Sequence, residues 1–565
     1  MLDVVHRHRV AFVLTLVCLA ALSAGIVLAG EPEPFTSPAW PGGTPHRVPA
    51  AAPPGVLPEA APGDYVVLAW NDLGMHCYNR SFQDLAVLPP YNNLYAQVLI
   101  VGDPPQVVTA GITVTYFFTD NTYSVGKSNF WDYAQQLFGV ALPPNIGLTG
   151  KGLAGDMDVA GDHFVAEGIP LTEFRDSAPT VPYPYQVATI VVYDRATGLE
   201  LARTTPVAGV STEMHCDNCH YDNGPGNEDI ATGVVEQNIL TKHDDEHAGD
   251  YPPGHEGPLM GRRPILCAEC HASNALGAPG VPGLPNFSHA MHDKHKEIVP
   301  DTLAGCYNCH PGPQTQCLRD VMYARGMDCV DCHGGMAQVA ANPNPWLNEP
   351  RCDSAACHGA AFQQDQALYR QSKEHGGDFC EACHDSTHAV APSIEANDAL
   401  KFAGWQGHNG PLDTCTVCHA SWPTGPGPHG LTAPTGPDFT FNPDRYGMRE
   451  PGQQAVYLHG LHNSGNVADV YHLSFSSSQG WAAVGGAVAG GPTFTLPADV
   501  SLVPDQSAVV TVTVTVPDTD TVRTLTDTTI VTATSSVSPT LVRHVTDRTY
   551  VLPRRSYVYL PLIFK

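Results

Sequence analysis

The sequence predicts a multidomain protein with a β-sandwich near each end and a central segment of short helices and loops. Stretches rich in Val, Ile, Tyr and Thr occur towards both ends. The segment between them has almost no apolar periodicity, and most Cys and His residues gather there. The parts that we expect are residues 1–29, 30–63, 64–212, 213–430 and 431–565.

Composition and charge limit the class of function. The chain has 565 residues, enough for three or four domains of about 150 residues each. Acidic residues outnumber basic ones 56 to 28, which gives a formal net charge of −28. A nucleic-acid-binding protein needs Lys and Arg to neutralise phosphates, so that class is disfavoured. The 17 Cys and 27 His are too many for packing alone, and their spacing is the main evidence on function.

The first 29 residues have the pattern of a secretory signal peptide. Arg7 and Arg9 precede an apolar run over residues 10–29, which ends in a small-residue cleavage pattern. The alternative is an uncleaved anchor, because about 20 apolar residues can span a bilayer. We expect cleavage and an exported mature chain without a membrane span, located extracellularly, on the cell surface or in the periplasm. The Pro- and Ala-rich residues 30–63 predict an extended linker.

Residues 64–212 predict a β-rich domain. Four stretches have the composition of strands and are bounded by Gly, Pro and Asn clusters. A single helix is expected near residues 130–138. The expected strands are residues 65–70, 94–101, 112–118 and 186–193.

The last part of the chain predicts an immunoglobulin-like β-sandwich. Residues 509–516 read VVTVTVTV, an alternation that places the Val residues on one face of a strand. Further strands are expected at residues 529–534 and 548–552. This part resembles the accessory β-modules of exported bacterial proteins. The terminal YVYLPLIFK is either a last strand or an attachment signal, and the strand is favoured.

The central segment contains a repeated motif, C-x-x-C-H. Random placement would give about 0.02 copies in a chain of this composition, so six copies are not accidental. A further copy has a wider Cys spacing and consists of Cys352, Cys357 and His358. The six regular copies are Cys216/Cys219/His220, Cys267/Cys270/His271, Cys306/Cys309/His310, Cys329/Cys332/His333, Cys380/Cys383/His384 and Cys415/Cys418/His419.

This motif is typical of covalent haem attachment. Two thiols add to the vinyl groups of one haem, and the adjacent His binds the iron as its proximal ligand. Zinc ribbons, iron–sulfur clusters and disulfides give no reason for a His directly after every Cys pair. We therefore predict seven covalently attached haem c groups, which would replace the apolar side chains that residues 213–430 lack.

With these motifs, residues 213–430 resemble the multihaem c-type cytochromes of bacterial respiration and extracellular electron transfer. The resemblance implies closely packed haems that pass electrons to redox proteins or extracellular acceptors, and it permits self-association into filaments. It implies an electron-transfer protein rather than an enzyme. The alternative is a multihaem oxidoreductase that acts on a small nitrogen or sulfur compound at an open haem. Electron transfer is favoured because C-x-x-C-K, the catalytic motif of pentahaem nitrite reductases, does not occur.

A second His on the far side of each iron would close it to substrate. Between residues 214 and 472, fourteen His lie outside the motifs, so ligands are plentiful. Three of them have the spacing H-x-x-H-x-x-H, which predicts one face of a short helix that serves two neighbouring haems. The candidate distal ligands are His243, His247, His289, His292, His295, His375, His388, His408 and His462.

Three further Cys belong to no motif, and one of them, Cys18, lies within the predicted signal peptide. Cys77 and Cys317 would remain in the mature chain and form either a disulfide or two separate buried thiols. His76, next to Cys77, is an additional candidate for a distal ligand from the β-rich domain. Residues 243–247 match the inverted zinc-peptidase motif H-x-x-E-H, but a match this short is weak evidence between two haem motifs.

Overall fold

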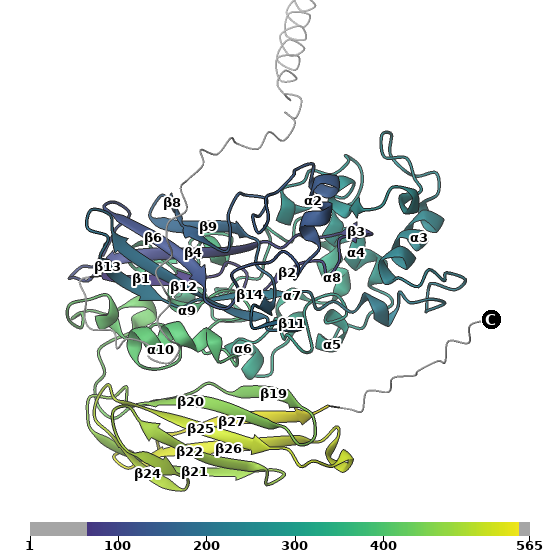
Figure 1. Cartoon of the computed structure of the whole chain (residues 1–565). Coiled ribbons are helices and arrows are strands. Elements are labelled where there is room, and N and C mark those ends of the chain that lie inside the picture. Colours follow the sequence, from purple (N-terminus) through teal and green to yellow (C-terminus); the bar gives the residue numbers. More distant parts are fainter. Residues whose placement is uncertain (1–64, 553–565) are drawn as a thin grey trace, which may run out of the picture. The chain divides into compact units, whose positions relative to one another are not determined.

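The computed structural model describes residues 65–552 (Figure 1). All of them belong to one compact unit, Val48–Lys565. The predicted signal peptide, the linker and the terminal YVYLPLIFK fall outside the described residues. Within residues 65–552, no helix is both long enough and apolar enough to cross a membrane.

The N-terminal part contains a five-stranded and a six-stranded sheet. The strands of the first sheet are β1 (Tyr65–Trp70), β4 (Asn92–Ile100), β5 (Gln106–Val107), β8 (Asp158–Ala160) and β9 (His163–Ile169). Those of the second are β2 (His76–Cys77), β6 (Ile112–Phe118), β7 (Ala154–Asp156), β12 (Tyr185–Asp194), β13 (Glu200–Thr204) and β14 (Val207–Ser211). Their main paths run β1-β4-β9-β8 and β2-β14-β12-β6-β7.

One hydrophobic core is built from both sheets. It includes Val67 on β1, Leu94 on β4 and Ile190 on β12, each at most 1% exposed. Strand β6 alternates between buried and half-buried residues along its whole length, which is why its composition was readable as a strand. Helix α2 (Phe130–Phe138) packs on this core through Phe130 and Leu137.

The strand predictions for this part agree closely with the structure. Strands β1 and β6 and helix α2 have the expected bounds, and β4 and β12 differ by one or two residues at their ends. The expectation of a β-rich fold with few short helices is therefore confirmed. The two-residue strands were not predicted, because so short a stretch carries no periodicity.

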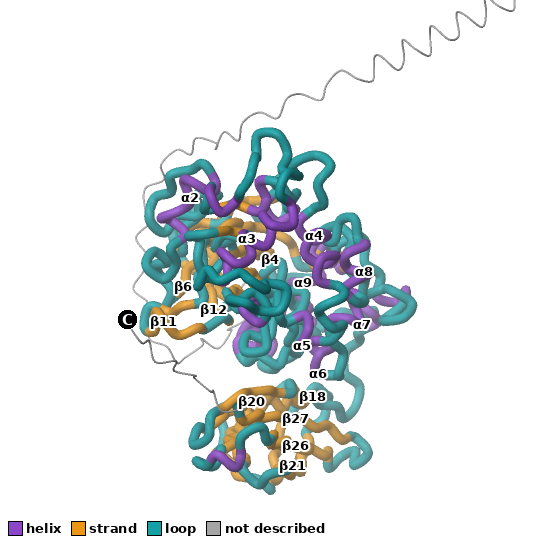
Figure 2. The backbone as a smooth tube through the Cα atoms, turned by 90° about the vertical axis from the view of Figure 1, so that its right-hand side faces the viewer, coloured by secondary structure: helices purple, strands orange, loops and turns teal. Residues whose placement is uncertain are grey.

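The central segment consists mainly of loops with short helices (Figure 2). Its α-helices are α3 (Val235–His247), α4 (Phe287–His295), α5 (Leu303–Cys306), α6 (Val321–Ala324), α7 (Cys329–His333), α8 (Met336–Ala341), α9 (Cys380–His384) and α10 (Leu400–Gln406). Its few strands form two-stranded pairs. These pairs are β15 (Ile265–Leu266) with β3 (Leu85–Ala86), and β16 (Lys373–Glu374) with β17 (Asp378–Phe379). A further pair, β10 (Phe174–Arg175) with β11 (Ala178–Pro182), precedes the segment.

The C-terminal part contains two five-stranded sheets. The first has β18 (Thr440–Asn442), β20 (Gln454–His462), β22 (Ala482–Val488), β23 (Thr493–Thr495) and β25 (Ser507–Thr515). The second has β19 (Arg445–Arg449), β21 (Asp469–Ser477), β24 (Ala498–Leu502), β26 (Thr526–Ser535) and β27 (Val542–Val551). Val510, Val512 and Val514 are fully buried between them, as the alternating pattern predicted.

The C-terminal sheets contact the central segment. The Ser507 hydroxyl donates a hydrogen bond to the Gly407 carbonyl at 2.7 Å. Next to it, the rings of His408 and His462 stack with centroids 4.2 Å apart. Both His side chains are nearly fully buried by this contact.

Candidate functional site

Each regular C-x-x-C-H motif folds into one tight turn. The backbone N–H of the His donates to the carbonyl of the first Cys, for example His220 to Cys216 at 2.8 Å and His419 to Cys415 at 2.9 Å. Helices α7 and α9 begin at the first Cys of their motifs. Residues three and four positions apart share a helix face, so the turn presents both thiols and the imidazole together.

The wide motif closes in the same way. The His358 N–H donates to the Cys352 carbonyl at 3.2 Å, although two more residues lie between the Cys residues. The added residues are taken up within the turn, and His358 follows Cys357 directly. We number the motifs in chain order, so the wide motif is the fifth.

Six of the seven motif imidazoles lie beside a second imidazole from elsewhere in the chain. We call this second ring the partner imidazole. The ring centroids of each pair are 5.8–6.4 Å apart. The pairs are His220 and His295, His271 and His243, His310 and His292, His333 and His388, His384 and His429, and His419 and His375.

This separation is the one expected for two imidazoles on opposite sides of a single metal ion. A bond of about 2.0–2.1 Å from metal to nitrogen, plus about 1.1 Å from nitrogen to ring centre, gives about 6.2 Å between centroids. The 4.2 Å between the stacked rings of His408 and His462 is too short to admit a metal ion between them. The six pairs are thus spaced for a metal between them.

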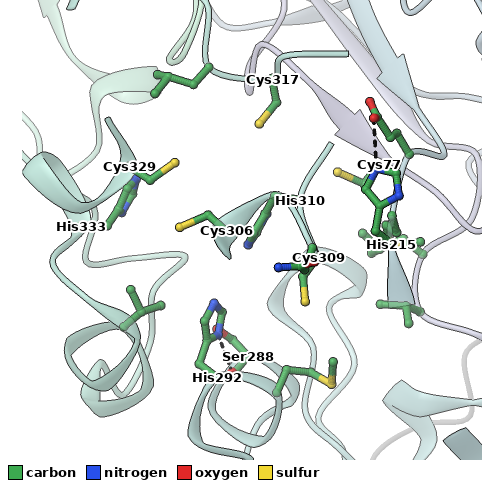
Figure 3. Close-up of a pocket in the computed structure, with 18 of the residues that line it drawn as sticks. Cys77, His215, Ser288, His292, Cys306, Cys309, His310, Cys317, Cys329 and His333 are labelled. Atoms are coloured by element: carbon green, nitrogen blue, oxygen red, sulfur yellow. Dashed lines mark hydrogen bonds and ion pairs between the residues drawn. The ribbon is translucent and has the colours of Figure 1, made fainter. Parts of the chain in front are cut away.

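Helix α4 orients two partner imidazoles. Nδ1 of His292 lies 2.7 Å from the Ser288 carbonyl oxygen, and Nδ1 of His295 lies 2.6 Å from that of Met291. An imidazole that donates Nδ1–H to a carbonyl presents Nε2 as a free ligand atom, which is the usual arrangement of metal-binding His. Figure 3 shows His292 and His310 pointing toward one another.

Three partner imidazoles come from residues with left-handed backbone. The φ angles are 39° for His375, 66° for His388 and 54° for His429. A non-glycine residue in this region is uncommon and is held there by its surroundings. The placement of these rings is therefore imposed by tertiary structure rather than by a local helix.

Burial keeps several of these imidazoles neutral. It lowers the pKa of His310 and of His384 to about 4 and that of His388 to about 3, and neighbouring His rings lower each further. A neutral imidazole is the form that binds a metal, since a proton on the ligand nitrogen would compete with it.

Thiols of different motifs are neighbours. Burial is the main cause that raises the pKa of Cys216, Cys332, Cys380 and Cys383, and a thiol of another motif raises each further. A hydrogen bond with Cys329 lowers the pKa of Cys306 to about 7. The neighbouring thiols are Cys216 and Cys309, Cys306 and Cys329, Cys332 and Cys357, Cys352 and Cys380, and Cys383 and Cys418. These electrostatic interactions indicate that the first, third, fourth, fifth, sixth and seventh motifs follow one another as a series.

Helix α3 joins the second motif to the first. It carries His243, the partner of the second motif, and also Lys242. Burial and His295 lower the pKa of His220 in the first motif, and Lys242 lowers it further. An ion pair of 2.6 Å between Lys294 and Glu246 links α3 to α4, which supplies the partner of His220. The second motif therefore precedes the first in the series.

A single large cavity connects the first five motifs. Its volume is about 3690 Å³, and the Cys and His of these five motifs line it. Figure 3 shows the part of it around the third and fourth motifs. A pocket for one small ligand or cofactor measures about 300–1,000 Å³, so the cavity fits several groups of that size. In residues 65–552, no group of three or more His, Cys, Asp or Glu side chains is placed to hold a bare metal ion.

Four candidate distal ligands lie elsewhere in the described chain. The ring of His247 is tilted by 53° against that of His243 with centroids 4.8 Å apart, and His408 stacks on His462. Nδ1 of His289 lies 2.6 Å from the Ala340 carbonyl oxygen. In residues 65–552 none of the four has a ring contact with a motif imidazole, and their role as ligands stays a prediction.

His429 is the partner imidazole that the sequence did not single out. It lies between Pro428 and Gly430, and its ring centroid is 5.9 Å from that of His384. The fold brings it back onto a motif 45 positions earlier in the chain. The only signal in the sequence was that His429 is one of the fourteen His outside the motifs between residues 214 and 472.

Cys77 and Cys317 are free thiols in the structure. Burial raises the pKa of Cys77 to about 12, and the neighbouring Cys317 raises it further. Figure 3 shows both side chains in the same close-up. His76 is held by the Asp72 carboxylate at 2.8 Å, so its ring is engaged within the β-rich part.

No family model and no curated protein matches the chain. Among solved structures, a family 123 glycoside hydrolase from Clostridium perfringens is 10% identical, with 19% of this chain and 23% of that chain covered and a TM-score of 0.16. PapD-like domain 7 of human CEP192 is 14% identical, with 21% and 87% covered and a TM-score of 0.15. A FixG-related protein from Vibrio parahaemolyticus is 11% identical, with 21% and 97% covered and a TM-score of 0.15. Scores this low carry no argument about fold or function.

Proposed function

We propose that this chain is an exported heptahaem c-type cytochrome that carries electrons along a series of covalently bound haems. The observation that carries the proposal is the pairing of six motif imidazoles with six partner imidazoles at 5.8–6.4 Å. Each pair suits one iron with both axial positions filled. The wide motif, through its equivalent turn, supplies the seventh attachment site.

The roles of the chain's own residues follow from this arrangement. When bound, haem supplies an iron that gains and loses one electron without changing its ligands. The paired thiols would hold the porphyrin covalently, and the motif imidazole and its partner would both bind the iron. A site held in this way would be closed to substrate, which favours electron transfer over catalysis.

The spatial series of motifs supports transfer from one haem to the next. Neighbouring thiols join the first motif to the third, then the fourth, fifth, sixth and seventh, and α3 joins the second to the first. Each haem would therefore have neighbours on both sides except at the ends. The cavity of about 3690 Å³ leaves room for porphyrins where apolar side chains are few.

The proposal extends to location and partners. The N-terminal signal-peptide pattern supports export, and the formal charge of −28 suits basic redox proteins or cationic acceptors. Extracellular acceptors and self-association into filaments remain part of the proposal. The immunoglobulin-like C-terminal module would be an accessory part of the same exported protein.

One observation favours a second candidate function, a multihaem oxidoreductase. His358 of the fifth motif is exposed, and the ring beside it belongs to Phe362, with centroids 5.3 Å apart. A Phe side chain cannot bind iron. A fifth haem with one open axial position would admit a small nitrogen or sulfur compound.

Mass spectrometry and electron paramagnetic resonance of the purified protein test both candidates. We expect a mass increase equal to seven haems and low-spin ferric signals from the six sites with paired imidazoles. A protein without covalent haem would overturn the proposal entirely. Seven haems with one high-spin signal that shifts on addition of nitrite or hydroxylamine would favour the oxidoreductase.

A further inference from the structure

The ring of Phe362 lies between the imidazoles of two motif sites. Its centroid is 5.3 Å from that of His358 in the fifth motif and 4.8 Å from that of His429. His429 is in turn the partner of His384 in the sixth motif, at 5.9 Å. One aromatic side chain therefore contacts a ring of each site.

Core burial does not explain this position. Phe362 is 39% exposed and ends the short 3-10 helix Ala360–Phe362, four residues after His358. The plane of the Phe362 ring is tilted by 59° to that of His358 and by 34° to that of His429. Both centroid distances are typical of favourable aromatic contacts. The two imidazoles are the aromatic neighbours that this partly exposed ring has in the described structure.

His429 depends on such contacts for its placement. Its φ of 54° lies in the left-handed region, which a His side chain adopts only when its surroundings hold it there. The side-chain contacts that face its ring come from Phe362 and His384, while Glu374 lies 3.7 Å from its Nε2. Loss of the Phe362 ring would free one side of the imidazole.

The junction between the fifth and sixth motifs lies inside the series. Cys357 neighbours Cys332 of the fourth motif, and Cys352 neighbours Cys380 of the sixth. Electrons that cross from the second motif to the seventh must therefore pass this junction.

We propose that Phe362 is a positioning residue that couples the fifth and sixth haem sites. Its ring fixes the orientation of His358 and His429 and fills the space between them with packed atoms. Electronic coupling decays less steeply through packed atoms than through water, and the orientation of an axial imidazole tunes its iron. The ring itself is neither oxidised nor reduced. This inference rests on the proposed function.

The test uses the full haem-loaded chain and the variants Phe362→Leu and Phe362→Tyr. Leu keeps apolar volume without a ring, and Tyr keeps the ring. After flash reduction, we expect electrons to redistribute along the Phe362→Leu chain several-fold more slowly, with shifted resonance signals from the fifth and sixth haems. In Phe362→Tyr, we expect the redistribution rate and the resonance signals to match those of the wild type.

Phe287→Leu is the matched control. The Phe287 ring is 6.4 Å from that of His271 in the second motif, at the end of the series rather than inside it. We expect Phe287→Leu to alter the resonance signal of the second haem alone. Seven haems with unchanged redistribution and unchanged signals in Phe362→Leu would overturn the inference and leave the proposed function standing. Absence of covalent haem in the wild type would instead overturn the proposed function.

Discussion

At the scale of single residues, Glu381 in the sixth motif carries the strongest electrostatic constraint. Its side chain is fully buried, and neither carboxylate oxygen has a hydrogen-bond partner in the described structure. Burial raises its pKa well above the usual value, and the nearby Asp72 and Asp385 raise it further, while Lys401 opposes them. The carboxyl group therefore keeps its proton in the folded protein at pH values where the unfolded chain has lost it.

This raised pKa predicts a pH-dependent stability. Above about pH 4.5 the folded protein holds one proton more than the unfolded chain, so the free energy of unfolding falls as pH rises, by at most about 1.4 kcal/mol per pH unit. Glu381→Gln removes the titrating group. We therefore expect the free energy of unfolding of this variant to change less with pH between about pH 5 and pH 8. Urea unfolding, followed by circular dichroism at each pH, measures this free energy.

Glu269 provides the control for this measurement. It occupies the second motif but is exposed and pairs with His255 at 3.3 Å. Glu269→Gln should leave the pH profile close to that of the wild type. Equal slopes in the wild type and Glu381→Gln would show that Glu381 is ionised in the folded protein.

At the scale of elements, helix α4 shows what a sequence pattern can determine. The spacing of His289, His292 and His295 predicted a helical face that serves two neighbouring haems. The helix is present, and two of the three rings lie beside motif imidazoles of the first and third motifs. Which two of the three do so follows from the packing of α4 against its neighbours.

Substitution along α4 tests this assignment. His292→Ala and His295→Ala should each free one axial position, because each ring faces one motif imidazole. We expect each variant to bind about one carbon monoxide per chain more than the wild type when reduced, as an open haem does. Absorbance titration in the Soret band measures the stoichiometry.

His289→Ala is the control on the same helix, since its Nδ1 faces the Ala340 carbonyl oxygen. It should bind no more carbon monoxide than the wild type. Extra binding in His289→Ala, together with none in His292→Ala, would reverse the assignment of ligands on α4.

At the scale of the whole molecule, the C-terminal sheets and the central segment are joined by buried polar contacts. Arg445 on β19 is 5% exposed, and its guanidinium donates to the carbonyls of Ser393 and Leu458, both at 3.2 Å. It also lowers the pKa of Glu395, which burial raises. The contact stabilises the junction because a lone buried carbonyl or carboxylate would be costly.

Arg445→Ala should loosen this junction. The buried Ser393 carbonyl loses a donor, at about 1–3 kcal/mol, and cleavage by protease within residues 431–439 should become faster. The haem count per chain should stay unchanged. Arg543→Ala is the control, since that side chain is 47% exposed and lies 3.6 Å from Asp438. Equal cleavage rates in both variants would contradict a stabilising role for Arg445.

The sequence by itself determined several strands and the positions of the Cys–His motifs. Enrichment in Val, Ile, Tyr and Thr predicted β1 and β6, and the alternation of Val and Thr predicted the buried Val face of β25, because both signals are local. Local spacing likewise defined the seven Cys–His motifs, since thiols and imidazole must meet within one turn.

Only the tertiary structure decided which imidazoles meet. His375, His388 and His429 reach their partners through left-handed backbone and loops, and nothing in their local sequence encodes those contacts. The series of motifs likewise follows from contacts between distant thiols. A ligand pair spans two chain segments, so its geometry depends on how the whole segment folds around its core.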